Sequence, residues 1–228
     1  WVGKHSGVLS STLGSWFLLG QILLDRELAP DPPVERERCG TCVRCLTACP
    51  TGAIVAPYEV DARLCISYLT IEHKGVVPLE LREKIGDWLF GCDACLDACP
   101  WNRFAPAARE SRLHARELPD WTLERFLSLN EAAFFELFEG SPIRRADREG
   151  FVRNVCIVLG NRRDAAHVPA LARTLEHDVS PLVRLHAAWA LGRIGGAAAR
   201  AALARAVTRE PDGGARDEAR RSLAECAA

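Results

Sequence analysis

Cysteine spacing is the feature of this 228-residue chain that most limits what it can fold into. Most of the ten cysteines fall in two short runs. The first run has the spacing C-x2-C-x2-C-x3-C, is followed by Pro50, and consists of Cys39, Cys42, Cys45 and Cys49. This is the bacterial spacing for a pair of 4Fe–4S clusters, in which the fourth cysteine of a run ligates the other cluster.

The second run is incomplete, and one isolated cysteine can complete it. Cys99 precedes Pro100 as Cys49 precedes Pro50, but Leu89 occupies the position of the first cysteine. We predict that Cys65 replaces the missing ligand. With the crossing rule, the eight ligands divide into two sets of four. Set 1 is Cys39, Cys42, Cys45 and Cys99, and set 2 is Cys49, Cys65, Cys92 and Cys95.

Two other interpretations of the cysteines are weaker. Structural zinc sites usually use two C-x2-C pairs for each ion, whereas the first run places three cysteines in succession before a C-P step. A disulfide framework is typical of small secreted domains. We therefore predict an electron-transfer module with two clusters.

The amino-terminal region reads like the middle of a domain. The chain has no methionine, and Trp1 runs directly into an apolar segment, so we expect a fragment of a longer protein. The longest apolar stretch, from Trp16 to Leu24, is interrupted by Gly20 and Gln21 and is too short to span a bilayer. We expect no membrane segment.

Hydrophobic periodicity and breakers predict several helices. We expect one over residues 14–28, one over 61–72 that Asp61 caps, one over 78–89, and two short ones around Asn130 within 121–138. The turn at residues 140–142 is the strongest domain boundary.

Beyond this boundary lies an internal repeat of 32 residues. The segment 155–161 recurs at 187–193 and, more faintly, at 219–225. Two helices at this period resemble short HEAT repeats, which stack into an α-solenoid. Val155 aligns with Ala187 and Cys156 with Ala188 of the next repeat, which predicts that both positions lie in the packed core.

Charge divides the chain into two parts. Residues 1–140 carry 14 basic and 20 acidic side chains, a net of −6, whereas residues 141–228 carry 15 arginines and 10 acids, a net of +5. We predict a solvent-facing phosphate-binding stripe on the first repeat helix, made of Arg144, Arg145, Arg148 and Arg153. The alternatives are ordinary solvated arginines and a codon bias, because arginine outnumbers lysine 26 to 3.

Several segments together resemble one enzyme family, the epoxyqueuosine reductases of tRNA queuosine synthesis. The matching segments cover nearly the whole chain. They are residues 1–5, 14–20, 39–54, 61–72, 91–102, 141–145 and 153–161. The run from Cys65 to Thr70 is more specific than the cysteine spacing.

The resemblance implies that the whole protein removes the epoxide oxygen of epoxyqueuosine at the tRNA wobble position. Two clusters would pass electrons to a base-off cobalamin, whose reduced cobalt attacks the epoxide while an aspartic acid protonates the departing oxygen. That acid would lie upstream of Trp1, so we assign no catalytic residue here and expect this chain alone to be inactive. Predicted cobalamin contacts are Ser67, Asp93, Val8 and Leu19.

The predicted fold is mainly helical, with four parts. Residues 1–35 would be the tail of an α/β cobalamin-binding domain, 36–110 a ferredoxin-like domain with two 4Fe–4S clusters, 111–140 a helical connector and 141–228 HEAT-like repeats. We expect a cytoplasmic monomer whose partners are tRNA and an electron donor. Two alternatives stay open: a ferredoxin-like carrier whose repeats dock a protein, and a cobalamin-dependent reductase of small molecules.

Overall fold

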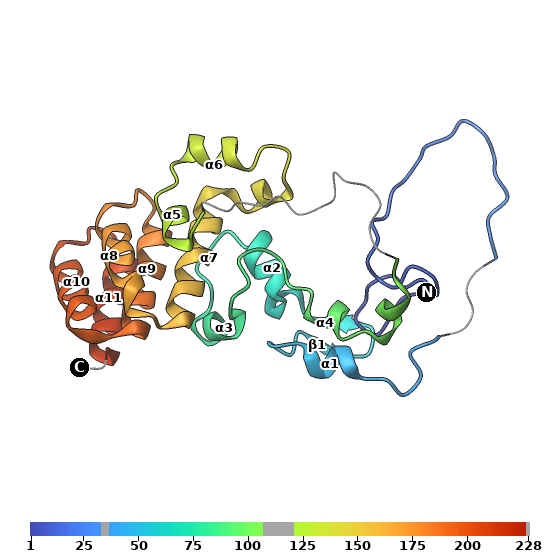
Figure 1. The fold of residues 1–228 in the computed structure, drawn as a ribbon, viewed down its shortest axis with the longest axis horizontal. Helices are drawn as coiled ribbons and strands as arrows, with labels where there is room; N and C mark the ends of the chain where they lie inside the picture. Colours follow the sequence, from blue (N-terminus) through green and yellow to red (C-terminus); the bar gives the residue numbers. More distant parts are fainter. Residues whose placement is uncertain (33–36, 107–120, 227–228) are drawn as a thin grey trace. The chain divides into compact units, whose positions relative to one another are not determined.

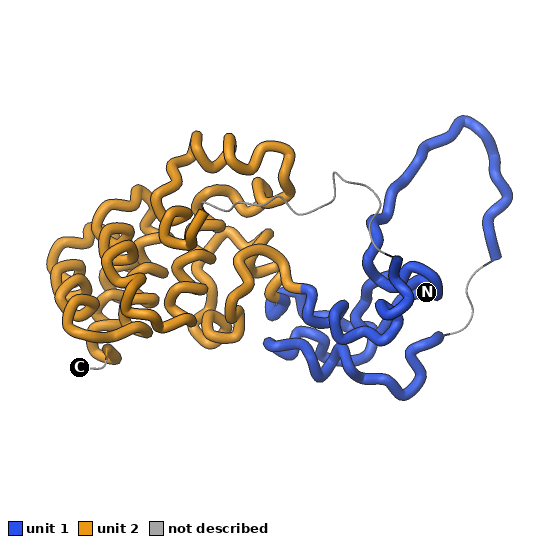
Figure 2. The backbone as a smooth tube through the Cα atoms, viewed as in Figure 1, with its two compact units in different colours: residues 1–65, 93–117 blue, residues 66–92, 118–228 orange. Residues whose placement is uncertain are grey.

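The structure is a computed structural model that describes residues 1–32, 37–106 and 121–226. Two compact units are present, shown in two colours in Figure 2. Unit 1 comprises residues 1–65 and 93–117, and unit 2 comprises residues 66–92 and 118–228. These boundaries differ from the predicted domains, because residues 66–92 pack with the helical repeats. Residues 107–120, which include part of the predicted connector, lie outside the described ranges.

Unit 1 is built from short helices and strands joined by loops (Figure 1), and most of its cysteines lie outside the helices. Helix α1 (Arg44–Ala48) packs against α4 (Ala94–Asp97) and against β1 (Ile54–Ala56). Strand β1 pairs antiparallel with β2 (Glu59–Val60). The 3-10 helices η1 (Ala62–Leu64) and η3 (Pro100–Phe104) follow Asp61 and Cys99. A unit with so few buried apolar residues gains stability when its thiolates bind metal.

The helix predicted over residues 14–28 is wrong. Residues 16–32 have no regular secondary structure, and Leu18, Ile22 and Leu23 are 82%, 85% and 96% exposed. An amphipathic stripe forms a stable helix mainly by packing against a partner. The described part of unit 1 supplies no such partner for these side chains, so the apolar pattern alone does not make a helix.

Unit 2 contains most of the helices (Figure 1). The segment 66–92 folds into α2 (Ile66–Ile71), α3 (Leu79–Arg82) and η2 (Glu83–Ile85). The predicted helix over 61–72 is therefore broken at Cys65, and the helix over 78–89 ends at Ile85. The two helices predicted around Asn130 are confirmed as α5 (Leu123–Leu127) and α6 (Glu131–Leu137), and the Asn130 side chain caps α6.

The repeats follow as η5 (Pro142–Ala146), α7 (Asp147–Arg162), η6 (Ala165–His167), α8 (Val168–His177), α9 (Pro181–Ile194), α10 (Gly196–Arg209) and α11 (Gly213–Glu225). Helix α9 packs between α7 and α11, while α8 and α10 contact each other. No described helix combines the length and the apolar character that a membrane crossing requires.

Small residues at equivalent repeat positions set the close packing of α7, α9 and α11. Val155, Ala187 and Ala219 are each 0% exposed, as the repeat alignment predicts. A Cβ on Gly160 would lie 2.8 Å from Trp189 Cζ3, and a Cβ on Gly192 would lie 2.7 Å from Ser222 Cβ. Glycine is thus required at both places where one inner helix crosses the next.

Buried polar groups hold the segment 66–92 against the repeats. Arg82 pairs with Glu218 of α11, with both side chains buried, and donates to the Val77 carbonyl. His186 of α9 accepts the Val77 N–H at Nε2 and donates from Nδ1 to the Leu182 carbonyl. Burial, together with nearby positive groups, lowers the pKa of His186 well below its usual value. The ring is therefore neutral at physiological pH.

Candidate iron–sulfur site

Set 1 of the predicted ligands comes together in unit 1. Cys39, Cys42, Cys45 and Cys99 line one cavity of about 80 Å³. Cys39 and Cys42 belong to a tight turn in which the Cys42 N–H donates to the Cys39 carbonyl. Cys45 lies on α1, and Cys99 caps η3. The fourth thiol thus comes from the second run, as the crossing rule requires.

The thiols in this cavity favour their protonated, neutral form unless a metal is bound. Burial raises the pKa of Cys45 and of Cys99, and the charges of Cys39 and Cys42 add to this effect. Iron binds thiolates, so cluster binding releases the thiol protons, and the metal offsets the cost of burying the negative sulfurs. In the described ranges, no three His, Cys, Asp or Glu side chains are placed to hold a single ion. A cubane does not need this, because each thiolate binds a different iron.

The segment before the first run encloses this cavity. Lys4 Nζ donates to the carbonyls of Gly40 and Cys42, at 2.5 and 3.2 Å, and therefore braces the cysteine turn. His5 lines the same cavity and is only 8% exposed. Its Nδ1 accepts the Gly7 N–H at 3.0 Å, but its Nε2 has no hydrogen-bond partner among the described residues. A buried donor without a partner fits a site that a cluster occupies.

A second brace links the N-terminal segment to the second run. The Asn102 side-chain oxygen accepts both the N–H and the hydroxyl of Ser15, at 2.7 and 2.9 Å. Its amide nitrogen donates to the Leu96 carbonyl. A Cβ on Gly14 would lie 2.5 Å from the same Asn102 oxygen.

Sequence patterns did not assign Lys4, His5 or Asn102 to the site. The available signal was the pair of glycines, Gly3 and Gly7, on either side of Lys4 and His5. Two glycines in so short a polar segment indicate a tight loop in which the backbone passes close to other groups.

Set 2 is divided between the units, because Cys49, Cys65 and Cys95 lie in unit 1 and Cys92 lies in unit 2. The Cys49 sulfur accepts the Ala53 N–H at 3.2 Å and contacts the Thr51 hydroxyl. Burial acts to raise the pKa of Cys49, but these hydrogen bonds lower it overall. The assignment of one cluster to set 2 stays a prediction.

A chain of hydrogen bonds in unit 2 positions Cys92. The Ser67 hydroxyl accepts the Cys92 N–H at 2.9 Å and donates to the Cys92 carbonyl. The Thr70 hydroxyl accepts the Gly91 N–H. Asn154 of α7 donates to the carbonyls of Thr70 and Leu89. The first repeat helix thereby fixes α2, and α2 fixes the loop that carries a predicted cluster ligand.

The other predicted cobalamin contacts lie in unit 1. Asp93 is half-buried, and burial, followed by the charge of Asp97, raises its pKa. Val8 forms a β-bridge with Val2 and is 39% exposed. Leu19 is 75% exposed. Ser67 already uses its hydroxyl on Cys92, so its observed contact is the local one.

The predicted arginine stripe is partly wrong. Arg144 and Arg145 are exposed, but Arg148 and Arg153 are buried, at 6% and 0% exposure. Arg148 forms a buried ion pair with Asp178. These two side chains do not face solvent, because neighbouring parts of unit 2 cover that side of α7.

Arg153 has a structural role instead. Its guanidinium donates to three backbone carbonyls, those of Leu69, His73 and Gly75, at 2.7 to 2.9 Å. Asn154 accepts two further hydrogen bonds from it. Burial lowers the pKa of Arg153 to about 10, so the group stays charged at neutral pH.

Two family matches define the class of protein to which these sites point. Residues 38–102 match the 4Fe-4S double cluster binding domain, and residues 143–224 match HEAT repeats. The chain therefore combines a 4Fe–4S binding domain with a HEAT-repeat region in a mainly helical fold.

The relatives are more specific. The chain is 46% identical over 196 residues to the epoxyqueuosine reductase of Xanthomonas campestris pv. campestris, which covers 86% of this chain and 55% of the relative. It is 46% identical over 204 residues to the epoxyqueuosine reductase of Escherichia coli K12, with 85% and 51% covered. The resemblance predicted from the sequence is confirmed. The chain spans about half the length of the curated relatives it matches.

Solved structures agree with these relatives. The epoxyqueuosine reductase of Bacillus subtilis, with its catalytic aspartate loop swung out of the active site, superposes with a TM-score of 0.88 at 32% identity over 100% of this chain and 61% of that chain. An epoxyqueuosine reductase with an epoxyqueuosine-modified tRNA-Tyr stem loop gives a TM-score of 0.87 at 30% identity, with 99% and 60% covered.

Proposed function

We propose that this chain is the cluster-bearing and repeat-bearing part of an epoxyqueuosine reductase. The observation that carries the proposal is the convergence of Cys39, Cys42, Cys45 and Cys99 on one cavity, in a chain similar to that family over most of its length. Set 1 would hold one 4Fe–4S cluster and set 2 the other. When bound, the clusters would supply electrons one at a time, and cobalamin would supply a reducible centre for the two-electron reduction that removes the epoxide oxygen.

In that reaction, the residues of this chain would bind the clusters, brace the cysteine loops and position the ligands. Lys4 and Asn102 hold the two cysteine runs in place, and Ser67 orients the backbone of Cys92. For cobalamin we propose the contacts that the resemblance implies, namely Ser67, Asp93, Val8 and Leu19. We assign no catalytic acid to residues 1–228. Such an enzyme would act on tRNA in the cytoplasm as a monomer and would need an electron donor.

Exposed arginines whose side chains form no ion pair are the best candidates for contact with tRNA. Many arginines of the repeats are occupied, as in the ion pairs of Arg162 with Asp87 and of Arg184 with Glu210. Four further exposed or half-exposed arginines are also paired, namely Arg145, Arg163, Arg220 and Arg221. In contrast, the exposed guanidinium groups of Arg173, Arg205 and Arg209 form no hydrogen bond or ion pair with a described residue.

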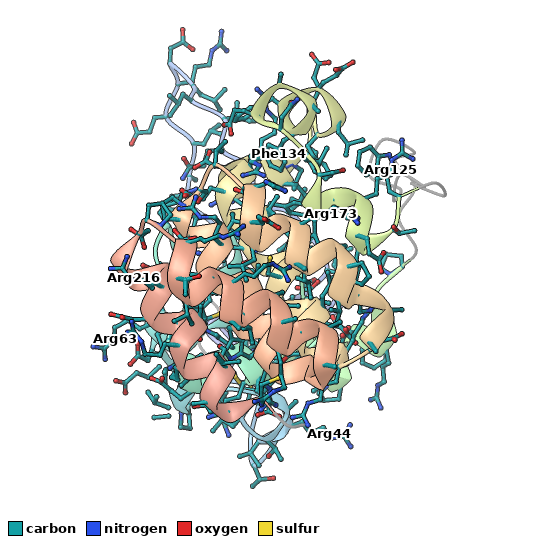
Figure 3. All side chains as sticks on the ribbon, turned by 90° about the vertical axis from the view of Figure 1, so that its left-hand side faces the viewer. Arg44, Arg63, Arg125, Phe134, Arg173 and Arg216 are labelled. Atoms are coloured by element: carbon teal, nitrogen blue, oxygen red, sulfur yellow. The ribbon has the colours of Figure 1, made fainter. Side chains whose placement is uncertain are left out.

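The repeat period places these free arginines on successive outer helices. Arg173 of α8 and Arg205 of α10 are 32 residues apart and occupy equivalent positions, and Arg173 is labelled in Figure 3. Arg205 and Arg209 line the groove between α8 and α10, where Glu176 also lies. Arg173 lines the neighbouring groove beside α5. A row of cations on neighbouring helices suits the regularly spaced phosphates of an RNA backbone.

The test of the proposed function uses the natural polypeptide that carries this sequence, reconstituted anaerobically with iron, sulfide and cobalamin. It should convert epoxyqueuosine-containing tRNA to queuosine-containing tRNA, and a Cys99→Ala variant should not. Cluster loading without corrinoid or tRNA binding would instead favour the ferredoxin-like carrier. Corrinoid binding without tRNA binding would favour a reductase of small molecules.

A further inference from the structure

His5 is a buried polar group at the set 1 cavity whose chemistry the ligand assignment leaves unused. Its imidazole is buried against the loop of residues 3–9. A Cβ on Gly3 would lie 3.2 Å from Nε2, and a Cβ on Gly7 would lie 2.8 Å from Nδ1. The loop is closed by two backbone hydrogen bonds, Gly3 N–H to the Gly7 carbonyl and Ser6 N–H to the Gly3 carbonyl. Two glycines thus let the backbone pass close to both ring nitrogens.

The hydrogen bond at Nδ1 fixes the tautomer of the ring. Because Nδ1 accepts the Gly7 N–H at 3.0 Å, it cannot carry a proton itself, so the neutral ring carries its proton on Nε2. That N–H is buried and has no acceptor in the described residues. Leaving a buried donor without an acceptor has a free-energy cost, because the donor has lost its hydrogen bonds to water. An acceptor in the cavity would remove this cost.

We propose that the His5 Nε2–H donates a hydrogen bond to a sulfur of the cluster held by set 1 and thereby raises the reduction potential of that cluster. This rests on the proposed assignment of a cluster to Cys39, Cys42, Cys45 and Cys99. Reduction adds one electron, and thus one negative charge, to the cluster. A fixed N–H donor stabilises the more negative form, and hydrogen bonds to the sulfurs are among the factors that set the potential. No proton is transferred in this step.

Two substitutions separate the donor from the rest of the loop. In His5→Asn, the side-chain oxygen takes the place of Nδ1 and can still accept the Gly7 N–H, but nothing replaces the Nε2 donor. In His5→Gln, the amide nitrogen takes the place of Nε2 and can still donate toward the cavity. The pair therefore tests the hydrogen bond rather than the presence of a histidine.

The experiment begins with iron and sulfide content after anaerobic reconstitution, followed by a dithionite titration monitored by electron paramagnetic resonance. In His5→Asn, reduction of one cluster should become about tenfold less favourable, a fall of about 59 mV for a one-electron couple. His5→Gln should recover most of this shift. The reduction potential of the other cluster is an internal control and should stay unchanged. An unchanged potential in His5→Asn with both clusters present would overturn the proposal.

A second measurement starts from the parent protein. In the reduced parent labelled with 15N-histidine, pulsed electron paramagnetic resonance should detect the coupling of one histidine nitrogen to a cluster, and His5→Gln should abolish it. A parent spectrum without histidine coupling would refute the inference. Failure to load any cluster would instead refute the proposed function, so the two failures are distinguishable.

Discussion

Arg153→Leu should destabilise unit 2 strongly, although the residue belongs to an arginine-rich region where a role in RNA binding would be the first expectation. The substitution keeps an apolar side chain in the buried site and removes all the guanidinium donors. The carbonyls of Leu69, His73 and Gly75 would then lose their partners. Because these carbonyls anchor the segment next to α2, the predicted ligand Cys92 should also be held less firmly.

The magnitude follows from the number of groups that are left unsatisfied. A buried acceptor without a donor costs about 1–3 kcal/mol, and the Leu69 carbonyl is buried whereas those of His73 and Gly75 are partly buried. The costs do not add fully, and removal of a buried charge offsets part of them, so we expect the free energy of unfolding to fall by about 3–5 kcal/mol. This is a large fraction of the total for a typical domain, about 5–15 kcal/mol.

Urea unfolding followed by the helical circular dichroism signal measures this change. With a urea dependence of about 2 kcal/mol per molar, the midpoint should fall by about 2 M. The matched control is Arg144→Leu, since Arg144 is exposed and stacks over Phe135, and it should change the unfolding free energy by less than about 1 kcal/mol. If Arg153→Leu unfolded like the parent but bound tRNA more weakly, the structural role assigned to Arg153 would be refuted.

Three further predictions concern the repeats. The triple variant Arg173→Ala, Arg205→Ala, Arg209→Ala should bind tRNA more weakly with unchanged helicity. The slope of log affinity against log salt concentration should become shallower by about one unit for each phosphate that is no longer neutralised. An unchanged slope would exclude a role for these side chains in tRNA binding. Gly160→Ala should cost about 1–3 kcal/mol in thermal unfolding, because its Cβ has no space, and a neutral result would contradict the close helix crossing. The pKa of His186 in the folded chain lies below its unfolded value of about 6.5. Its neutral ring therefore contributes its full stabilisation above pH 6.5, and this stabilisation is lost as the pH falls below 6.5 toward the folded pKa. His186→Gln should weaken this pH dependence in urea midpoints measured from pH 7.5 to 5.5.

The parts predicted well from the sequence are those with a fixed spacing. The cysteine runs prescribe which thiols share a cavity, and the structure brings Cys39 and Cys99 together although 60 positions separate them. The 32-residue repeat likewise predicts that Val155 and Ala187 are packed, since similarity at a fixed period reflects one packing environment. In both cases the spacing of the residues along the sequence follows directly from a geometric requirement of the fold.

The parts predicted poorly depend on what covers a surface. Arg153 occupies a position that a lone helix would expose, but the segment 66–92 packs there and supplies carbonyl acceptors. The apolar residues near Leu19 have a helical pattern and no partner in the described part of unit 1, so no helix forms. A short polar loop such as the one around His5 has no periodicity to read. The role of His5 depends on its hydrogen bond to Gly7 and on the cavity beyond it, which residue types do not encode.

The most direct test of the ligand assignment is the iron content of a double variant. The reconstituted parent should contain about eight iron and eight sulfide per chain, and Cys65→Ala and Cys99→Ala should each retain about four. If the two cysteines serve different clusters, as the crossing of the runs requires, the double variant should lose nearly all its iron. If the double variant still retained about four iron per chain, both cysteines would serve the same cluster, and the division that places Cys99 in set 1 and Cys65 in set 2 would be contradicted.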